Sequence, residues 1–329
     1  MTEERVPALV IAYNRPDFLR ELLQTLTQSP VSAIYIAVDG VASTPGVNKS
    51  SYWEVREICQ NFTAQVPVHL LTQPTNLGTG RAVPAAISWF FTQEERGVIL
   101  EDDCRPTSDF FPFAIELLEY YAESDDVFMI SGNNHRLDRV TAPDEYSFSR
   151  HGQIWGWATW RRAWAHYDHS MAAWPSLRRS RWLEEICGGY PDAVRYWRWI
   201  FDETIKDKVD AWDYRWTFAM WHEKGLSVVP PRNLVENIGF DARSTHTTSA
   251  PDWYGEIPRG EVRFPLRHPA IPSVDSDGDR WTDVNIFNTE LRGLARLKQS
   301  MLRTLARVGL DRFALRLVSV LRSMRKLSA

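Results

Sequence analysis

Short apolar runs alternate with amphipathic stretches over the first 130 residues, and this alternation is the strongest constraint on the fold. Between the first two apolar runs, Pro16 opens a segment whose leucines recur at helical spacing. Strands that alternate with helices predict an α/β fold with a mixed, mainly parallel, Rossmann-like sheet. The runs that we expect to be buried strands are 8–13, 34–38, 68–72, 98–100 and 127–130.

A chain of 329 residues that is 44% hydrophobic can bury a large core. We expect one principal domain over 1–250, divided into the halves 1–130 and 131–250. Most of the 15 tryptophans lie between 150 and 221, which we expect to be helical. A Pro- and Asp-containing stretch predicts a loop or wrap-around arm over 251–287, followed by a helical C-terminal extension over 288–329.

The three cysteines are far apart and form no CxxC pair, which is typical of a reducing compartment. The first residues lack the apolar run of a signal peptide, and no stretch of about 18 apolar residues occurs. We therefore expect a cytoplasmic protein that does not span a membrane.

Polar residues follow each of the first four predicted strands. In parallel α/β sheets, ligands bind beyond the carboxyl ends of the strands. The segments expected to meet there are 13–15, 39–40, 76–81 and 101–103.

The sequence EDD at 101–103 places three adjacent carboxylates after a hydrophobic strand. Adjacent carboxylates repel one another unless they are solvated or bound to a cation. Mg²⁺ and Mn²⁺ prefer oxygen ligands and often use one or two carboxylates together with substrate phosphates. A divalent-metal site is one interpretation, and a solvated acidic turn is the other.

The sequence NLGTGRA at 76–82 predicts a glycine-containing turn that leads into an apolar helix. Gly78 and Gly80 would let backbone amides approach an anion, and Arg81 could bind phosphate through its fork of donors. The spacing matches neither of the common phosphate-loop patterns, so an ordinary helix entry is the alternative.

In order, YNRP at 13–16, VDG at 38–40, NLGTGRA, EDD and DFF at 109–111 resemble the nucleotide-binding elements of GT-A glycosyltransferases. The likeness is to the family 2-like and N-acetylglucosaminyltransferase I-like enzymes, and it covers about the first 115 residues. It implies that Asp39 binds the base, Arg81 the diphosphate or sugar, and Asp103 the metal. The nucleotide-sugar-binding residues that it implies are Ala12, Tyr13, Arg15, Asp39, Asn76, Gly78, Arg81, Glu101 and Asp102.

The second half carries weaker likenesses to the same family. HGQIWGWATWRR resembles a glycine-containing loop near the donor and implicates Gly156 and Trp157, although bulky tryptophans are as often core residues. AWDYRW resembles the motif of the catalytic base and implicates Asp213, with Glu203 and Asp210 as neighbouring competitors. In NIGFDARSTHT, His246 resembles a histidine that reaches the metal or diphosphate, although a lone histidine is often structural.

The resemblance implies an inverting, metal-dependent glycosyltransferase that uses Mn²⁺ or Mg²⁺. A UDP-sugar is the favoured donor, and a hydroxyl group of a glycan or glycolipid is the expected acceptor. One alternative is a sugar nucleotidyltransferase, although that class usually has a glycine-rich loop where this chain reads AYNRP. Another is a catalytically degenerate protein that stacks sugars on its tryptophans.

The C-terminal segment from 290 to 327 is basic and amphipathic. It carries ten Lys and Arg against Glu290 and Asp311, with apolar residues at helical spacing. Such a helix suits an anionic membrane surface and a lipid-linked acceptor, which would place the protein peripherally at the inner face of the membrane. Packing on the main domain or on a partner chain is the alternative. Nucleic acid is not an expected partner, and the sequence predicts no oligomeric state.

Overall fold

A computed structural model describes residues 4–41, 49–136, 142, 144–240 and 261–290. The chain divides into two compact units, 1–282 and 283–329, and only 283–290 of the second are described. The strands are β1 Val6–Ala12, β2 Val31–Val38, β3 Val68–Thr72, β4 Arg96–Glu101, β5 Cys104–Pro106, β6 Val127–Ser131, β7 Ser147–Ser149, β8 Trp157–Trp160, β9 Leu226–Val229 and β10 Val235–Asn237. The helices are α1 Pro16–Thr27, α2 Lys49–Asn61, α3 Thr79–Gln93, α4 Phe110–Tyr120, α5 Arg161–Trp164, α6 Trp174–Leu177, α7 Trp182–Ile186, α8 Pro191–Thr204, α9 Asp213–His222 and α10 Ser276–Asn285.

The main sheet is mixed, as the alternation of apolar runs predicts. Its strand order is β3-β2-β1-β4-β8-β6-β9-β7. The pairs among β1 to β4 are parallel, and β6 is parallel to β9. Strand β8 is antiparallel to both β4 and β6, and β7 is antiparallel to β9. The α/β, Rossmann-like prediction is therefore confirmed, and all five predicted strands are present.

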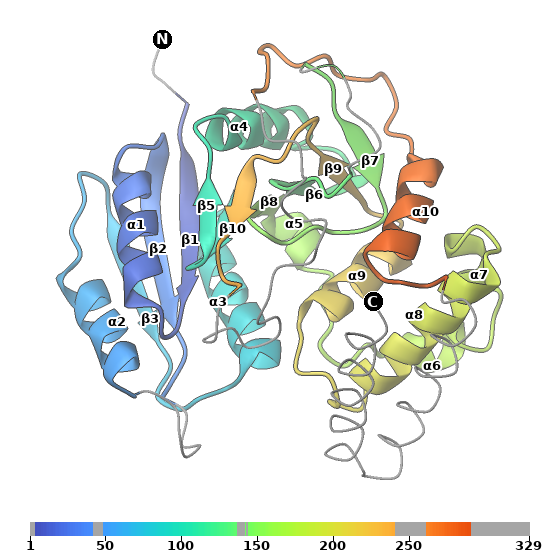
Figure 1. Ribbon diagram of the computed structural model, residues 1–329, viewed down its shortest axis with the longest axis horizontal. Coiled ribbons are helices and arrows are strands. Elements are labelled where there is room, and N and C mark those ends of the chain that lie inside the picture. The colour runs from blue at the N-terminus through green and yellow to red at the C-terminus, as the bar shows by residue number, and fades with distance from the viewer. Residues whose placement is uncertain (1–3, 42–48, 137–141, 143, 241–260, 291–329) are drawn as a thin grey trace, which may run out of the picture. The chain divides into compact units, whose positions relative to one another are not determined.

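Helices cover both faces of the β1 to β4 part of the sheet. Ile34 and Ile36 share a core cluster with the leucines of α1. Tyr35 lies between these two isoleucines in β2 and packs on Phe90 of α3, with ring centroids 5.0 Å apart. Because successive side chains of a strand point to opposite faces, α1 and α3 lie on opposite sides of the sheet. Helices α1 and α2 pack against each other near β2 (Figure 1).

Strand order reverses between β1 and β4. The chain adds β2 and β3 on one side of β1 and then crosses to add β4 on the other side. Such a switch point leaves a crevice beyond the carboxyl ends of the two strands, because their connections leave in opposite directions. The acidic triplet at 101–103 emerges from β4 at this place.

A small second sheet pairs β5 with β10 in antiparallel register. Asn237 lies opposite Cys104, and the N–H of Ile238 donates to the carbonyl of Asp103 at 2.9 Å. This pairing brings a segment from late in the chain to the residues that follow β4, so both halves of the domain contribute to the same corner.

The tryptophan-rich region contains the helices α5 to α9, but loops separate them and β8 also runs through the region. Trp157 lies in β8, is 1% exposed and stacks on Trp212 at 5.7 Å. Trp164 and Trp216 complete this aromatic core. A four-residue strand is too short to show a period of its own in the sequence.

Two further predictions need correction. Strand β3 is not fully buried, because it is the edge strand of the sheet and its central residues are exposed. The arm predicted over 251–287 is not entirely loop, because α10 occupies Ser276–Asn285. Residues 251–260 of the arm and 291–329 of the tail lie outside the described residues, so the proposed membrane-binding helix stays a prediction.

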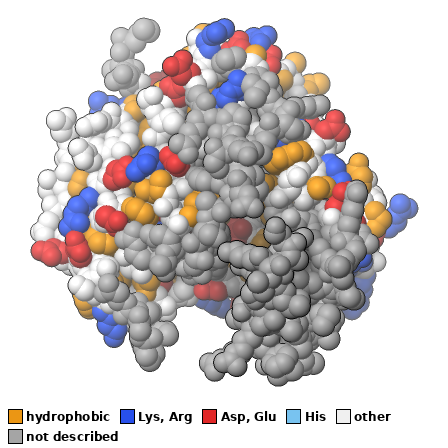
Figure 2. All heavy atoms as spheres, in the orientation of Figure 1, with side chains coloured by type: hydrophobic (Ala, Val, Ile, Leu, Met, Phe, Trp, Pro, Cys, Tyr) orange, Lys and Arg blue, Asp and Glu red, His pale blue; other side chains and the backbone are white. Residues whose placement is uncertain are grey.

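The surface of the described part is mixed in charge. Acidic and basic side chains are interspersed on the face shown in Figure 2. Among the helices of the described ranges, none has the length and hydrophobicity that crossing a bilayer requires.

Replacing Trp157 with alanine is expected to destabilise the protein by about 3–5 kcal/mol, because it leaves a large cavity in the aromatic core. Trp53 is the matched control: it is 55% exposed, and its replacement with alanine should change stability by no more than about 0.5 kcal/mol. Urea denaturation of the three proteins measures this difference. Equal midpoints for both variants would contradict the placement of Trp157 in the core.

Candidate functional site

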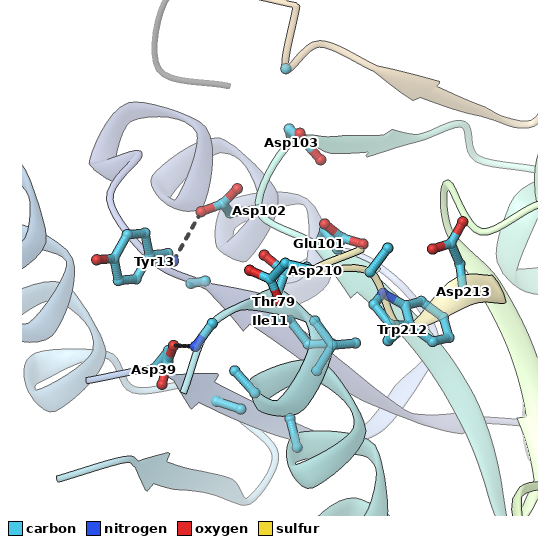
Figure 3. Close-up of a pocket in the computed structure, with 18 of the residues that line it drawn as sticks. Ile11, Tyr13, Asp39, Thr79, Glu101, Asp102, Asp103, Asp210, Trp212 and Asp213 are labelled. Carbon is cyan, nitrogen blue, oxygen red and sulfur yellow. Dashed lines mark hydrogen bonds between the residues drawn. The ribbon is translucent and has the colours of Figure 1, made fainter. Parts of the chain in front are cut away.

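A cavity of 820 Å³ opens beyond the carboxyl ends of β1, β2 and β4. Its walls come from the ends of these strands, from the start of α3, from the 208–214 segment and from the end of β10. Figure 3 shows carboxylates from several of these elements around one space. The lining residues that the sequence had implicated are Ala12, Tyr13, Arg15, Asp39, Asn76, Gly78, Glu101, Asp102, Asp103 and Asp213.

The acidic corner, which consists of Glu101, Asp102 and Asp103, forms one end of this cavity. Glu101 closes β4, and the N–H of Asp102 continues the ladder by donating to the carbonyl of Ile11. Asp102 accepts a hydrogen bond from the N–H of Tyr13 at 3.2 Å. The ends of β1 and β4 thus hold the corner in place through backbone contacts.

Arg15 supplies a positive charge to the acidic corner. Its Nη1 lies 2.5 Å from Oδ2 of Asp103 and 3.3 Å from Oδ1 of Asp102. Arg15, Asp102 and Asp103 are 9%, 6% and 7% exposed. The side chain predicted to contact the nucleotide is therefore paired with the predicted metal ligand.

Burial and mutual repulsion shift the titration of the corner. Burial, followed by the charges of Asp103 and Asp102, raises the pKa of Glu101 to about 8. Burial and Asp103 likewise raise the pKa of Asp102 to about 7, although Arg15 and the N–H of Tyr13 oppose the shift. The positive charge of Arg15 therefore does not cancel the effect of burial and mutual repulsion on the pKa values of Glu101 and Asp102.

Asp39 holds the glycine-containing turn before α3. Its carboxylate accepts hydrogen bonds from the N–H groups of Leu77 and Gly78 at 2.9 and 3.0 Å, and from Nδ2 of Asn76 at 2.9 Å. Burial raises the pKa of Asp39, although these backbone hydrogen bonds act in the opposite direction. The sequence predicted a contact with a nucleotide base, but in this structure the carboxylate organises its own loop.

The amino end of α3 is occupied by a carboxylate of the chain itself. The N–H of Gly80 donates to Oδ1 of Asp210 at 2.8 Å. A Cβ at Gly80 would lie 2.8 Å from the same oxygen, so a side chain there would displace the Asp210 carboxylate. The amide predicted to meet a phosphate meets Asp210 instead.

Arg81 does not line the cavity. Its Nη2 pairs with Asp207 at 3.2 Å, and its side chain is 59% exposed. Asp207 and Asp210 belong to one loop between α8 and α9, and this loop engages both predicted anion-binding groups of the α3 turn. The motif at 76–82 indicated the hydrogen-bond donors of Gly80 and Arg81. It did not indicate the acidic loop that accepts from them, because that loop lies about 130 residues later in the chain.

The three acidic residues that the sequence offered as a base lie in different surroundings. Asp213 begins α9 and lines the cavity, and its charge contributes to the raised pKa of Glu101. Asp210 also lines the cavity, but its carboxylate accepts a hydrogen bond from the N–H of Gly80. Glu203 lies outside the lining and pairs with Lys206 at 3.0 Å.

Arg215 braces the segment that leads to Asp213. It is 2% exposed and donates to the carbonyls of Thr204 and Ala211 and to the Asp207 carboxylate. A buried arginine with several acceptors fixes the path of the loop, so the carboxylates on it keep defined positions.

The structure does not bring Gly156 and Trp157 to the cavity. Gly156 has φ of 68°, and its carbonyl accepts from the N–H of Gly132 at 2.7 Å. Trp157 belongs to the core, so the core alternative is the one that the geometry supports. Their neighbours Ile154 and Trp155 line the cavity instead, and Trp155 meets Phe240 at 5.7 Å.

Sequence reasoning also missed Lys208 and Gly239 as lining residues. Gly239 follows β10, and a Cβ on it would clash with Oδ2 of Asp103. The signal for it was its place in the NIGF motif before His246. His246 itself lies outside the described residues, so its metal-binding role stays a prediction.

Asp102 and Asp103 are the residues of the acidic corner that could share a divalent cation with a substrate. Within the described ranges, His, Cys, Asp and Glu side chains form no group of three or more suited to hold a metal ion. Asp102 and Asp103 nevertheless already share one positive charge, that of Arg15. Two carboxylates suffice for Mg²⁺ or Mn²⁺ when phosphate oxygens and water complete the shell.

Stability should fall as pH rises between about 4.5 and about 8, because folded Glu101 holds its proton more tightly than unfolded Glu101 does. Glu101→Gln should reduce this slope by up to about 1.4 kcal/mol per pH unit. Denaturant unfolding at several pH values measures it, with Glu95→Gln, an exposed carboxylate outside the cavity, as the control. Parallel profiles for wild type and Glu101→Gln would contradict the prediction.

Comparison with known proteins gives no family for this chain. No model of a known protein family matches the sequence, and no curated protein matches it. Among solved structures, HddC from Yersinia pseudotuberculosis is similar over 48% of this chain and 77% of its own, with 10% identity and a TM-score of 0.29. The inositol-1-phosphate CTP transferase from T. maritima is similar over 50% of this chain and 74% of its own, with 12% identity and a TM-score of 0.28.

Proposed function

We propose that the protein is a transferase that binds a nucleotide-sugar in the cavity and moves the sugar to an acceptor hydroxyl. The observation that carries the proposal is the meeting of the acidic corner with Asp213 around one 820 Å³ cavity at the strand-order switch. A cavity of this size suits a ligand as large as a nucleotide-sugar. Its carboxylates provide a site for a metal-bound diphosphate at one end and a base at another.

The diphosphate is assigned to the Arg15 end of the cavity. The amino end of α3 is occupied by Asp210, and Arg81 is paired outside the lining. Arg15 and Lys208 are the basic side chains among the described lining residues. Asp103, with Asp102 beside it, would hold Mn²⁺ or Mg²⁺, which when bound supplies charge neutralisation for the departing diphosphate.

Asp213 is assigned the role of the base that takes the proton from the acceptor hydroxyl. The oxygen of the acceptor hydroxyl forms a bond to the anomeric carbon, and the bond from that carbon to the diphosphate oxygen breaks. The nucleoside diphosphate leaves with the bonding electron pair, and Asp213 takes the hydroxyl proton. A single displacement of this kind inverts the anomeric centre.

Nucleotidyl transfer is the second candidate, because it is the activity in the name of the T. maritima protein. The likeness itself carries no argument at its TM-score. The connection from β1 to α1 is three residues long, Tyr13 to Arg15, and contains no glycine. Products separate the candidates: a nucleotidyltransferase releases pyrophosphate from a nucleoside triphosphate and a sugar 1-phosphate, whereas the proposed enzyme releases a nucleoside diphosphate from a nucleotide-sugar.

One class among UDP-, GDP- and dTDP-sugars should raise the melting temperature in the presence of Mn²⁺, because a ligand that binds the native state stabilises it. At 100 times its Kd, a ligand contributes about 2.7 kcal/mol. Asp103→Ala should abolish the metal-dependent part of the shift, whereas Asp125→Asn, on the exposed surface, should keep it. A folded wild-type protein that no nucleotide stabilises would remove the main support for the proposal.

Asp213→Asn should retain donor binding but slow release of the nucleoside diphosphate by about 10²-fold or more, because the amide cannot accept the proton. Glu203→Gln, at a competing carboxylate outside the cavity, is the matched variant, with turnover expected near wild type. Donor binding is measured by thermal shift and turnover by product release. Undiminished turnover in Asp213→Asn would exclude this residue as the base.

A further inference from the structure

Arg15 contacts the acidic corner through only one of its nitrogens. Both of its hydrogen bonds, to Asp102 and Asp103, use Nη1. Its Nε is buried and has no hydrogen-bond partner in the structure. The Nε and Nη2 edge is the planar fork of donors that matches two oxygens of a phosphate.

This arrangement leaves Arg15 incompletely satisfied. A buried donor without an acceptor costs free energy that a new partner can recover. Burial opposes the charge of Arg15, but Asp102 and Asp103 outweigh it and raise its pKa above the ordinary value. Because an arginine side chain stays charged in proteins, the guanidinium needs an anion beside it.

Arg15 also pairs with Asp103, the carboxylate that is assigned to the metal in the proposed function. Its Nη1 lies 2.5 Å from Oδ2 of Asp103, so the guanidinium competes with a divalent cation for this oxygen. Two positive charges this close together would repel strongly in a buried corner. Metal binding is therefore easier once Arg15 has moved to another anion.

We propose that Arg15 masks the metal-binding carboxylate Asp103 in the ligand-free protein and exchanges it for the diphosphate of the nucleotide. The inference rests on the proposed function, because it takes the diphosphate from the nucleotide-sugar donor. Divalent metal and nucleotide then bind cooperatively: each removes one obstacle to the other, and the coupling is reciprocal. Arg15 is a positioning residue for the metal site and a binding residue for the diphosphate.

The experiment titrates Mn²⁺ into the full chain by isothermal calorimetry, first without nucleotide. Arg15→Gln should bind Mn²⁺ about tenfold more tightly than wild type, because the competing charge is gone. Arg15→Gln combined with Asp103→Asn should lose this gain. Arg20→Gln, five residues along on the exposed side of α1, is the control and should match wild type. Arg15→Lys keeps the charge and should remain close to wild type, and circular dichroism checks that each variant folds.

A second titration adds UDP, or GDP or dTDP if the donor panel selects it. In wild type, the nucleotide should tighten Mn²⁺ binding by about tenfold or more, and Arg15→Gln should lose most of this coupling. If Arg15→Gln binds free Mn²⁺ no more tightly than wild type while nucleotide still stabilises wild type, the masking role is overturned and the proposed function stands. If no nucleotide stabilises wild type with or without metal, the proposed function fails first.

Discussion

The pairing of Arg15 with Asp102 and Asp103 is the interaction on which the site depends. Strand β4 delivers three carboxylates to one partly closed corner, and without a cation this corner would be strongly repulsive. Arg15 is available because β1 ends beside β4 and only three residues separate β1 from α1. The parallel register of these two strands therefore places the counter-charge, and the same register creates the crevice that a ligand can enter.

Acidic side chains rather than an incoming anion satisfy the donors around the α3 turn. Asp39 accepts from Leu77 and Gly78, and Asp210 accepts from Gly80. Backbone N–H groups at the start of a helix attract negative charge whatever its source, so a motif that predicts an anion there is equally consistent with a carboxylate of the chain. The sequence does not show whether a bound anion or a carboxylate of the chain accepts these hydrogen bonds, because Asp210 is distant along the chain.

The sequence predicts the first half of the fold well, because a period of two in the strands and 3.6 in the helices follows from backbone geometry alone. The gathering of Tyr13, Asp39 and the acidic corner at one sheet edge follows from the parallel topology. Trp157 was harder to place, because a tryptophan in a dense aromatic segment fits a core strand and a ligand loop equally well. The partners of Arg15 and Arg81 could not be predicted, since contacts between side chains far apart in sequence depend on tertiary packing.

A segment from late in the chain meets Asp103. The β5 and β10 pairing holds the carbonyl of Asp103 against the N–H of Ile238 and sets Gly239 against its carboxylate. A side chain at 239 would collide with that carboxylate, so the close approach requires glycine. Asp103 is thereby restrained by Arg15 on one side and by the β10 segment on the other. A carboxylate confined in this way has few positions open to it. If Arg15 moves to another anion, Asp103 therefore stays in place and loses only its positively charged partner.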